Sequence, residues 1–340
     1  MAISGLALAD PVIKLVEQQV KDQGGILGGR EVKFVRYDNR GSVAEAAAGA
    51  QKLMTDDKVS ALTLGGISGA ESHAISDFAE QNKILYVTYG DLSNTVGQKK
   101  YTLGATVGFP QFVSTIVNLG LKVIKPKTVG SLSIDLSDSH DRVKSYKEQL
   151  ESAGAKTVYE EYVGPDTQDY MPYLTNIKSK QPDFLIIDIT PSEPYMTIGK
   201  QMMELGGWGN TKAVGLPGAE QAKKMAGIQG MYVLVLWVRG DTYPGAVKFE
   251  EGYKAINGST PSASQVYDYN CFWTAINAVD LAGTDTDLVK INEAAHSGNL
   301  EWDTPMGHAH YTAESGNLPG LMPRIAIVEN NILVPVTIPD

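Results

Sequence analysis

Three stretches of the sequence end an apolar run in a turn rich in glycine and hydroxyl side chains, and a helix-forming segment follows each of them. They are residues 59–69 (VSALTLGGISG), 129–139 (VGSLSIDLSDS) and 184–195 (FLIIDITPSEPY). When a parallel strand leads into a helix, its turn lies at the carboxyl edge of the sheet, where open α/β proteins bind ligands. Hydroxyl groups and the free amides of a helix N-terminus suit an anion such as a carboxylate. The pattern therefore predicts a protein that binds small molecules.

The first of these turns offers the clearest anion site. Ser68 precedes a predicted helix over 70–82, so its hydroxyl and the amides of Gly69 and Ala70 are predicted to face a ligand carboxylate. Ser68 and Glu71 also fit a capping box, in which each side chain satisfies a backbone donor of the other residue. The two roles are compatible because a cap lies at the same mouth of the helix.

The turn at 89–94 (YGDLSN) follows a predicted strand and contributes Gly90, Asp91 and Leu92 as candidate ligand contacts. Asp91 is either a partner for a donor group of the ligand or an ordinary turn residue. An acid beside a carboxylate site is unfavourable unless it meets an ammonium group, a hydroxyl or solvent.

Two candidates, Asp138 and Ser139, lie in the turn before a helix predicted over 139–153. Either residue could instead be the N-cap of that helix, which is the purely structural alternative.

Three further candidates come from later turns. Thr190 and Tyr195 flank Pro194, a residue suited to the first turn of a helix. Trp237 closes a predicted strand near a chain crossover, where a contact with a bound ligand is plausible.

Strands and helices alternate through most of the chain, which indicates βαβ units and parallel sheets. Strands are predicted over 1–10, 32–38, 59–66, 84–89, 101–107, 128–135, 156–163, 183–190, 212–216, 231–238 and 307–312, with helices over 43–54, 70–82, 109–122, 139–153, 170–180, 194–206, 219–227, 245–257, 264–282 and 287–297. A hairpin turned at Asn330 and Asn331 ends the chain, because asparagine tolerates the positive φ that such turns demand.

The 340 residues predict two domains, and no Pro/Gly/Ser-rich linker separates them. We therefore expect the chain to cross between the domains more than once. The net charge of −10 argues against nucleic acid or anionic lipid as a partner. The single cysteine, Cys271, excludes a disulfide framework and is expected to be a small core residue. No apolar run is long enough to span a bilayer, so no membrane insertion is expected.

Several segments, in one order, resemble the type I periplasmic substrate-binding proteins of ABC importers, in the branch that includes the leucine/isoleucine/valine-binding proteins. They are 24–38 (GGILGGREVKFVRYD), 52–59 (KLMTDDKV), 65–69, 80–88, 148–155 (EQLESAGA) and 169–183 (DYMPYLTNIKSKQPD). The resemblance covers nearly the whole chain.

The resemblance implies two α/β lobes with parallel sheets, joined by three crossovers near residues 107, 239 and 318. The N-terminal lobe would comprise 1–107 and 240–318, and the C-terminal lobe 108–239 and 319–340. Such proteins are exported, close on one small ligand by hinge motion, deliver it to a membrane permease and use no cofactor. An export signal would then have been removed from this chain. The same two-lobed arrangement also serves in receptors and regulators, so a sensor is the alternative of another class.

The resemblance also implies roles for residues, and this chain departs from the family at several of them. A serine hydroxyl and amides near Ser68 hold the ligand carboxylate in the family, but Leu92 stands where a threonine is usual. Asp138 and Ser139 replace a Tyr-Gly pair.

The most informative departure is at 215–220 (GLPGAE), where amino-acid binders carry a glutamate for the ligand ammonium. Pro217 occupies that position here, and Glu220 follows one turn later. An unpaired buried ammonium costs a few kcal/mol. Either Glu220 or Asp91 substitutes, or the ligand is an organic or aromatic acid without an α-amino group, which we favour over an amino acid.

The sequence patterns that could indicate catalytic residues are weak, so we do not expect an enzyme. In the segment 66–70 (GISGA), which half-resembles a nucleophile elbow, the second glycine is displaced and His73 follows on the same helix. No dinucleotide or P-loop glycine motif occurs. His308 and His310 share one strand face, but two histidines are too few for a structural zinc site.

Overall fold

The computed structural model describes residues 2–4, 9–40, 42–64, 69–89, 99–189, 193–216, 223–262, 265–312 and 321–339. The chain forms two compact units, which we call unit 1 (Met1–Gly108 with Thr242–Leu321) and unit 2 (Phe109–Asp241 with Met322–Asp340). The three boundaries between them lie one to three residues beyond the expected 107, 239 and 318.

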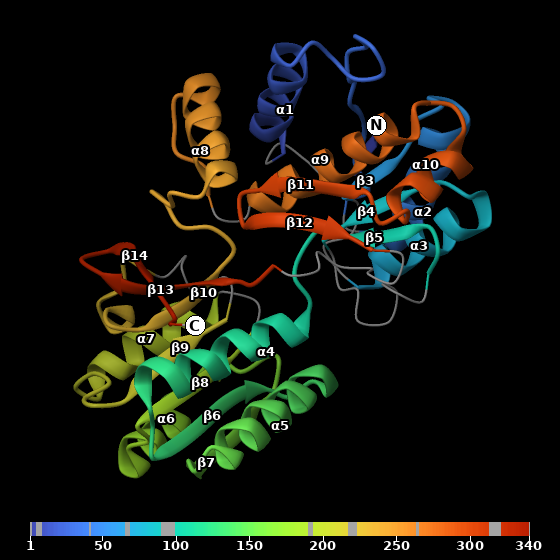
Figure 1. Ribbon diagram of the computed structural model, residues 1–340. Helices are drawn as coiled ribbons and strands as arrows, with labels where there is room; N and C mark the ends of the chain where they lie inside the picture. Colours follow the sequence, from blue (N-terminus) through green and yellow to red (C-terminus); the bar gives the residue numbers. More distant parts are fainter. Residues whose placement is uncertain are drawn as a thin grey trace. The chain divides into compact units, whose positions relative to one another are not determined.

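Unit 1 is built on a sheet of five parallel strands in the order β2–β1–β3–β4–β5. Figure 1 labels β3, β4 and β5 of this sheet. Its strands are β1 (Ala2–Ser4), β2 (Val35–Tyr37), β3 (Leu62–Leu64), β4 (Tyr86–Thr88) and β5 (Thr102–Gly104), with the antiparallel pair β11 (Leu300–Thr304) and β12 (Gly307–Tyr311) separate from the sheet. Its helices are α1 (Asp10–Asp22), α2 (Val43–Thr55), α3 (Gly69–Asn82), α8 (Pro244–Asn257), α9 (Gln265–Ala282) and α10 (Leu288–Ala295).

Apolar side chains of the helices and of the sheet form the core of unit 1. Ala50 and Leu53 of α2 and Ile75 of α3 pack with Leu62 and Tyr86 of the sheet. Helix α9 is buried along most of its length, and its residues Val266, Tyr269, Trp273 and Ile276 are at most 5% exposed. Cys271, on the same helix, is a free, fully buried thiol, as expected of a core residue.

Unit 2 contains a seven-stranded sheet in the order β14–β13–β10–β9–β8–β6–β7, in which β7, β6, β8, β9 and β10 are parallel. Its strands are β6 (Thr128–Ile134), β7 (Lys156–Val163), β8 (Phe184–Asp188), β9 (Lys212–Gly215), β10 (Tyr232–Val235), β13 (Arg324–Glu329) and β14 (Ile332–Val336). Its helices are α4 (Phe109–Asn118), the π-helical turn η1 (Leu119–Ile124), α5 (Ser137–Ser152), α6 (Met171–Lys180), α7 (Pro194–Glu204) and the 3-10 turn η3 (Ala226–Ile228).

The side chains of β8 show that both faces of the sheet in unit 2 are buried. Phe184 and Ile186 belong to a core cluster that includes residues of α4 and α5, whereas Leu185 and Ile187 belong to one that includes residues of α6 and α7. Successive strand side chains point to opposite faces, so a strand covered by helices on both sides must be apolar throughout. Asp188, the last residue of the strand, is the exception.

Most elements lie where the sequence predicts them, with a few differences. The predicted helix 109–122 changes to the wider π turn at Leu119 and ends at Lys125, which has a positive φ of 54°. Helix α1 and strand β11 were not predicted. No helix within the described ranges is long and apolar enough to cross a membrane.

The C-terminal hairpin confirms the turn chemistry expected from its asparagines. Strands β13 and β14 pair antiparallel from Ile325↔Val336 to Glu329↔Ile332. Asn330 and Asn331 between them have φ values of 50° and 65°, which is the left-handed region that asparagine tolerates.

The predicted helix over 219–227 is wrong in its described part. Residues 223–225 form a turn and bend, and η3 adds only three helical residues. The backbone at Gly227 lies so close to α7 that a β-carbon there would overlap the carbonyl oxygen of Gly199. This close approach fixes a short turn at the place where a longer helix was expected.

We predict that Gly227→Ala destabilises the protein by about 1–3 kcal/mol, because the added methyl must displace the α7 backbone. Gly164→Ala is the control, since the nearest atom to a β-carbon there is Thr167 Oγ1 at 3.8 Å. Urea unfolding of both variants measures the difference. Identical unfolding midpoints for the two variants would contradict the prediction.

Candidate functional site

The carboxyl ends of the parallel strands give each unit one candidate binding edge. In unit 1 this edge follows Ser4, Leu64 and Thr88, and in unit 2 it follows Ile134, Asp188 and Gly215. Seven predicted contacts lie outside the described residues: Ser68, Gly90, Asp91, Leu92, Thr190, Pro217 and Glu220. Their roles therefore stay predictions, and the described residues around them show how the edges are built.

At the edge of unit 1, α3 begins at Gly69, one residue before the predicted start. Ala70 is exposed in the first turn, as an amide donor to a ligand would need to be. Glu71 is only 3% exposed, and its Oε1 accepts a hydrogen bond of 3.0 Å from Asn39 Nδ2. Glu71, which was predicted to form a capping box with Ser68, therefore holds the segment that follows β2.

At the edge of unit 2, the predicted N-cap at Asp138 or Ser139 is wrong. Helix α5 begins earlier, at Ser137, and Leu136 occupies the N-cap position without a side-chain capping bond. Ser139 is fully buried, and its hydroxyl oxygen instead accepts a hydrogen bond of 2.8 Å from Arg142 Nη2.

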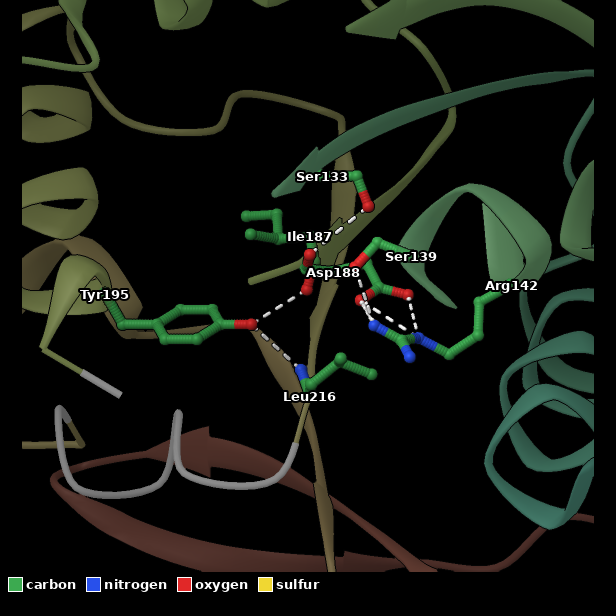
Figure 2. Close-up of polar contacts among 7 residues, drawn as sticks. All are labelled: Ser133, Ser139, Arg142, Ile187, Asp188, Tyr195 and Leu216. Carbon is green, nitrogen blue, oxygen red and sulfur yellow. Dashed lines mark hydrogen bonds and ion pairs between the residues drawn. The ribbon is translucent and has the colours of Figure 1, made fainter. Parts of the chain in front are cut away.

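Arg142 forms a buried ion pair with Asp188 at the end of β8 (Figure 2). Arg142 Nε lies 2.9 Å from Oδ2, and Nη2 lies 2.8 Å from Oδ1, so the contact is bidentate. The two side chains are 6% and 0% exposed. Such a pair has little net effect on stability compared with apolar residues, but it fixes geometry, because separating the partners leaves a buried charge.

Tyr195 links the ends of β8 and β9. Its side chain is fully buried, and its hydroxyl donates to the carbonyl oxygen of Ile187 at 2.8 Å and accepts from the amide of Leu216 at 3.0 Å (Figure 2). Ser133 of β6 donates to the carbonyl oxygen of Asp188 at 3.2 Å. These bonds position the strand ends that lead into Thr190 and Pro217, so the geometry favours a supporting role for Tyr195.

Sequence reasoning missed the Arg142–Asp188 pair, although a signal was present. The apolar run FLII of β8 ends in an acid, and a charge at the end of a strand buried on both faces requires a partner. Trp237, the remaining candidate of unit 2, is 3% exposed beyond the end of β10.

Two aromatic rings meet in unit 1 beyond the end of β4. The rings of Tyr89 and Tyr267 lie 4.9 Å apart between centroids, which joins the end of β4 to the start of α9. Burial raises the pKa of the adjacent Asp268 to about 7. Burial, with the charge of Asp268 next, also raises the pKa of Tyr89.

A hollow of about 230 Å³ in unit 1 lies away from this edge, at the amino end of β3. Ser60 and the Arg30–Asp285 ion pair line it. His308 and His310 share the exposed face of β12, as predicted, and His308 Nδ1 lies 2.9 Å from Asp303 Oδ1. Among the described residues no group of three or more His, Cys, Asp or Glu side chains could hold a metal ion.

Two α/β units with parallel sheets, each with helix-starting turns at its carboxyl edge, define a ligand-binding fold of the doubly wound class. The sequence from residue 5 to residue 326 matches the profile of the periplasmic binding protein family, and the chain belongs to that family. This confirms the resemblance and the fold class expected from the sequence. No curated protein matches the sequence.

Solved structures with this fold align over nearly the full chain. The leucine-binding protein LivK of Thermotoga maritima is 20% identical, with a TM-score of 0.78 over 99% of this chain and 97% of its own. A solute-binding protein of Rhodopseudomonas palustris in complex with 3,4-dihydroxybenzoic acid is 19% identical, with a TM-score of 0.79 over 99% and 95%. LivJ of Streptococcus pneumoniae in complex with isoleucine is 19% identical, with a TM-score of 0.78 over 97% and 94%.

We predict that Arg142→Met lowers the free energy of unfolding by about 3–5 kcal/mol, because Asp188 is then buried without its partner. Lys147→Met on the same helix is the control. It breaks an exposed pair with Glu160 and should cost less than about 1 kcal/mol.

Urea unfolding checks both variants, together with the double variant Arg142→Met/Asp188→Leu. The double variant should regain much of the lost stability, since it removes the unpaired charge. Equal stability of Arg142→Met and Lys147→Met would show that the buried pair does not fix this edge.

Proposed function

We propose that this chain is the extracytoplasmic solute-binding protein of an ABC importer, which binds one small carboxylate-bearing ligand and delivers it to a membrane permease. The observation that carries the proposal is the family match over residues 5–326. The carboxyl edges of both parallel sheets support it, because each leads into a turn at the start of a helix. Hinge motion at the three chain crossovers, without covalent chemistry, is part of the proposal.

The proposed contacts of unit 1 are the Ser68 hydroxyl, the amides of Gly69 and Ala70, and the 90–92 turn. The start of α3 supports this assignment, because the free amides of its first turn carry partial positive charge. In unit 2 we propose contacts from Asp138 in the first turn of α5 and from Thr190, Pro217, Glu220 and Trp237. Ser139 and Tyr195 hold these turns from within the core.

We propose an organic or aromatic acid as the ligand, because Pro217 replaces the glutamate expected of an amino-acid binder. Similar structures hold ligands of this kind: two proteins of Rhodopseudomonas palustris are complexes with 4-hydroxybenzoate and benzoate. Branched-chain amino acids are the second candidate, favoured by the similarity to LivK and LivJ.

We predict that simple carboxylates raise the melting temperature more than leucine or valine do. Free ligand at 100 times its Kd adds about 2.7 kcal/mol to the stability, which a thermal-shift screen resolves. The screen compares benzoate, 4-hydroxybenzoate and 4-methylpentanoate with the two amino acids. Stabilisation by leucine and valine, without any by the acids that lack an amino group, would assign the protein to the amino-acid binders.

We predict that Ser68→Ala weakens carboxylate binding about tenfold or more, because it removes a hydrogen bond to a charged group. Its cost to the ligand-free fold should be smaller. Ser42→Ala is the control: Ser42 caps α2 through the Glu45 amide, so its loss should cost about 1 kcal/mol of stability without changing affinity. Titration calorimetry and melting curves separate the two effects, and a Ser68→Ala variant that loses stability alone would have only the capping role.

A further inference from the structure

Arg324 lies at the carboxyl edge of the sheet in unit 2. It is the first residue of β13, and in the antiparallel register it pairs with Val235, the last residue of β10. Strand β10 in turn runs parallel to β9, with Val233 opposite Gly215, the last residue of β9. The start of β13 therefore lies along the same edge as the strand ends that lead into the candidate turns.

The side chain of Arg324 belongs to the face of the sheet that packs against α7. Ala326 and Val328, which lie two and four residues further along β13, belong to the core cluster that includes Tyr195 of α7. Residues two apart on a strand point to the same face, so Arg324 shares this face with them. Tyr195 is the residue whose hydroxyl bonds fix the ends of β8 and β9 on this side.

Arg324 uses little of its hydrogen-bonding capacity inside the fold. Its Nε lies 3.3 Å from Asp241 Oδ2, in an ion pair whose side chains are 38% and 17% exposed. This Nε is buried without a hydrogen-bond acceptor, and within the described ranges the two terminal nitrogens form no hydrogen bond either. Arg142, at the same edge, differs: it is 6% exposed and holds Asp188 through two nitrogens. Of these two arginines, Arg324 is the one that keeps donors for another group.

The chemistry of Arg324 indicates what that group must be. The two terminal nitrogens of a guanidinium lie in one plane and can hold a carboxylate through two parallel, charge-assisted hydrogen bonds. Asp241 pairs with Nε, so it leaves the terminal nitrogens available. Trp237, two residues after the strand partner of Arg324, adds apolar surface next to this end of β10. The fitting group is therefore a carboxylate attached to an apolar body.

We propose that the terminal nitrogens of Arg324 bind a carboxylate group of the ligand. The inference rests on the proposed function, in which the Ser68 turn holds one carboxylate, and it adds a second anionic group. Dicarboxylic acids with an apolar body are therefore the ligand class that this chain should prefer. Such a ligand carries no ammonium group and needs no acidic partner, which agrees with Pro217 in place of a glutamate.

Two matched pairs of ligands test this inference on the full chain. Benzoate and benzene-1,4-dicarboxylate differ by one carboxylate, as do hexanoate and hexanedioate, and the two diacids differ in the separation of their charges. For wild-type protein, the diacid of at least one pair should bind about 10- to 100-fold more tightly than its monoacid, because it gains hydrogen bonds between charged groups. Titration calorimetry measures the four affinities.

Arg324→Met removes the cation and should abolish the preference for the diacid, while the affinity for the monoacid stays the same. Arg324→Lys keeps the charge but cannot form two parallel bonds, so it should retain only part of the preference. Melting curves verify that the variants fold, and Arg324→Lys carries the comparison if Arg324→Met does not. Arg30→Met is the control, because it removes the same charge from an exposed ion pair with Asp285 in unit 1, away from the candidate edges.

The outcomes separate this inference from the proposed function. If wild-type protein binds the monoacids but prefers neither diacid, or if Arg324→Met keeps the preference, the Arg324 assignment is wrong and the proposed function stands. The same holds if Arg30→Met loses the preference equally, since the effect would then be one of net charge. If wild-type protein binds none of the four acids, the carboxylate class named in the proposed function fails together with the Arg324 assignment. Loss of the preference in Arg324→Met, with Arg30→Met unchanged, would establish the assignment.

Discussion

Parallel strand pairing places the carboxyl ends of neighbouring strands along one edge of a sheet, and the rest of each unit depends on how that edge is satisfied. In unit 2, side chains from the core satisfy most of this edge. Arg142 joins α5 to the end of β8, and Tyr195 joins β8 to β9. The turns that follow these strands therefore start from fixed positions, although their sequences are rich in glycine, proline and hydroxyl residues.

The edge of unit 1 is satisfied differently. Glu71 and Asn39 form a buried hydrogen bond there, which joins the first turn of α3 to the segment that follows β2. A buried ion pair contributes geometry because both charges are compensated within the fold. In the part of the chain that the structure describes, the edge of unit 2 is thus preorganised by a buried ion pair, and that of unit 1 by a buried hydrogen bond.

Periodicity was enough to predict the alternating strands and helices of parallel sheets, because strands such as β8 carry an apolar run of the length that burial on both faces demands. The two lobes with three crossovers were expected from the family resemblance. They also predicted the hairpin at Asn330, where the turn residues have a conformational reason. Local patterns failed where distant backbone decides the outcome. The helix expected over 219–227 ends in a short turn because Gly227 lies against Gly199 of α7, a contact that no local pattern contains.

The candidate site was predictable only in part, for a similar reason. Turns at strand ends are visible in sequence, and they gave Ser68, Asp138 and Thr190 as candidates. Whether a polar residue is buried and paired depends on tertiary packing, so the pairing of Ser139 with Arg142 and the enclosure of Tyr195 could not be read from local sequence.

Pro217, where the resemblance to amino-acid binders leads us to expect a glutamate, raises an energetic question about the ligand. A ligand donor that enters a closed site must find an acceptor, and an acceptor that is already buried must find a donor. A site built to hydrogen-bond a polar group rejects analogues that lack it far more strongly than an apolar pocket rejects a change in size. The exchange of an acidic residue for Pro217 therefore bears more on the choice of ligand than a change in the size of a pocket would.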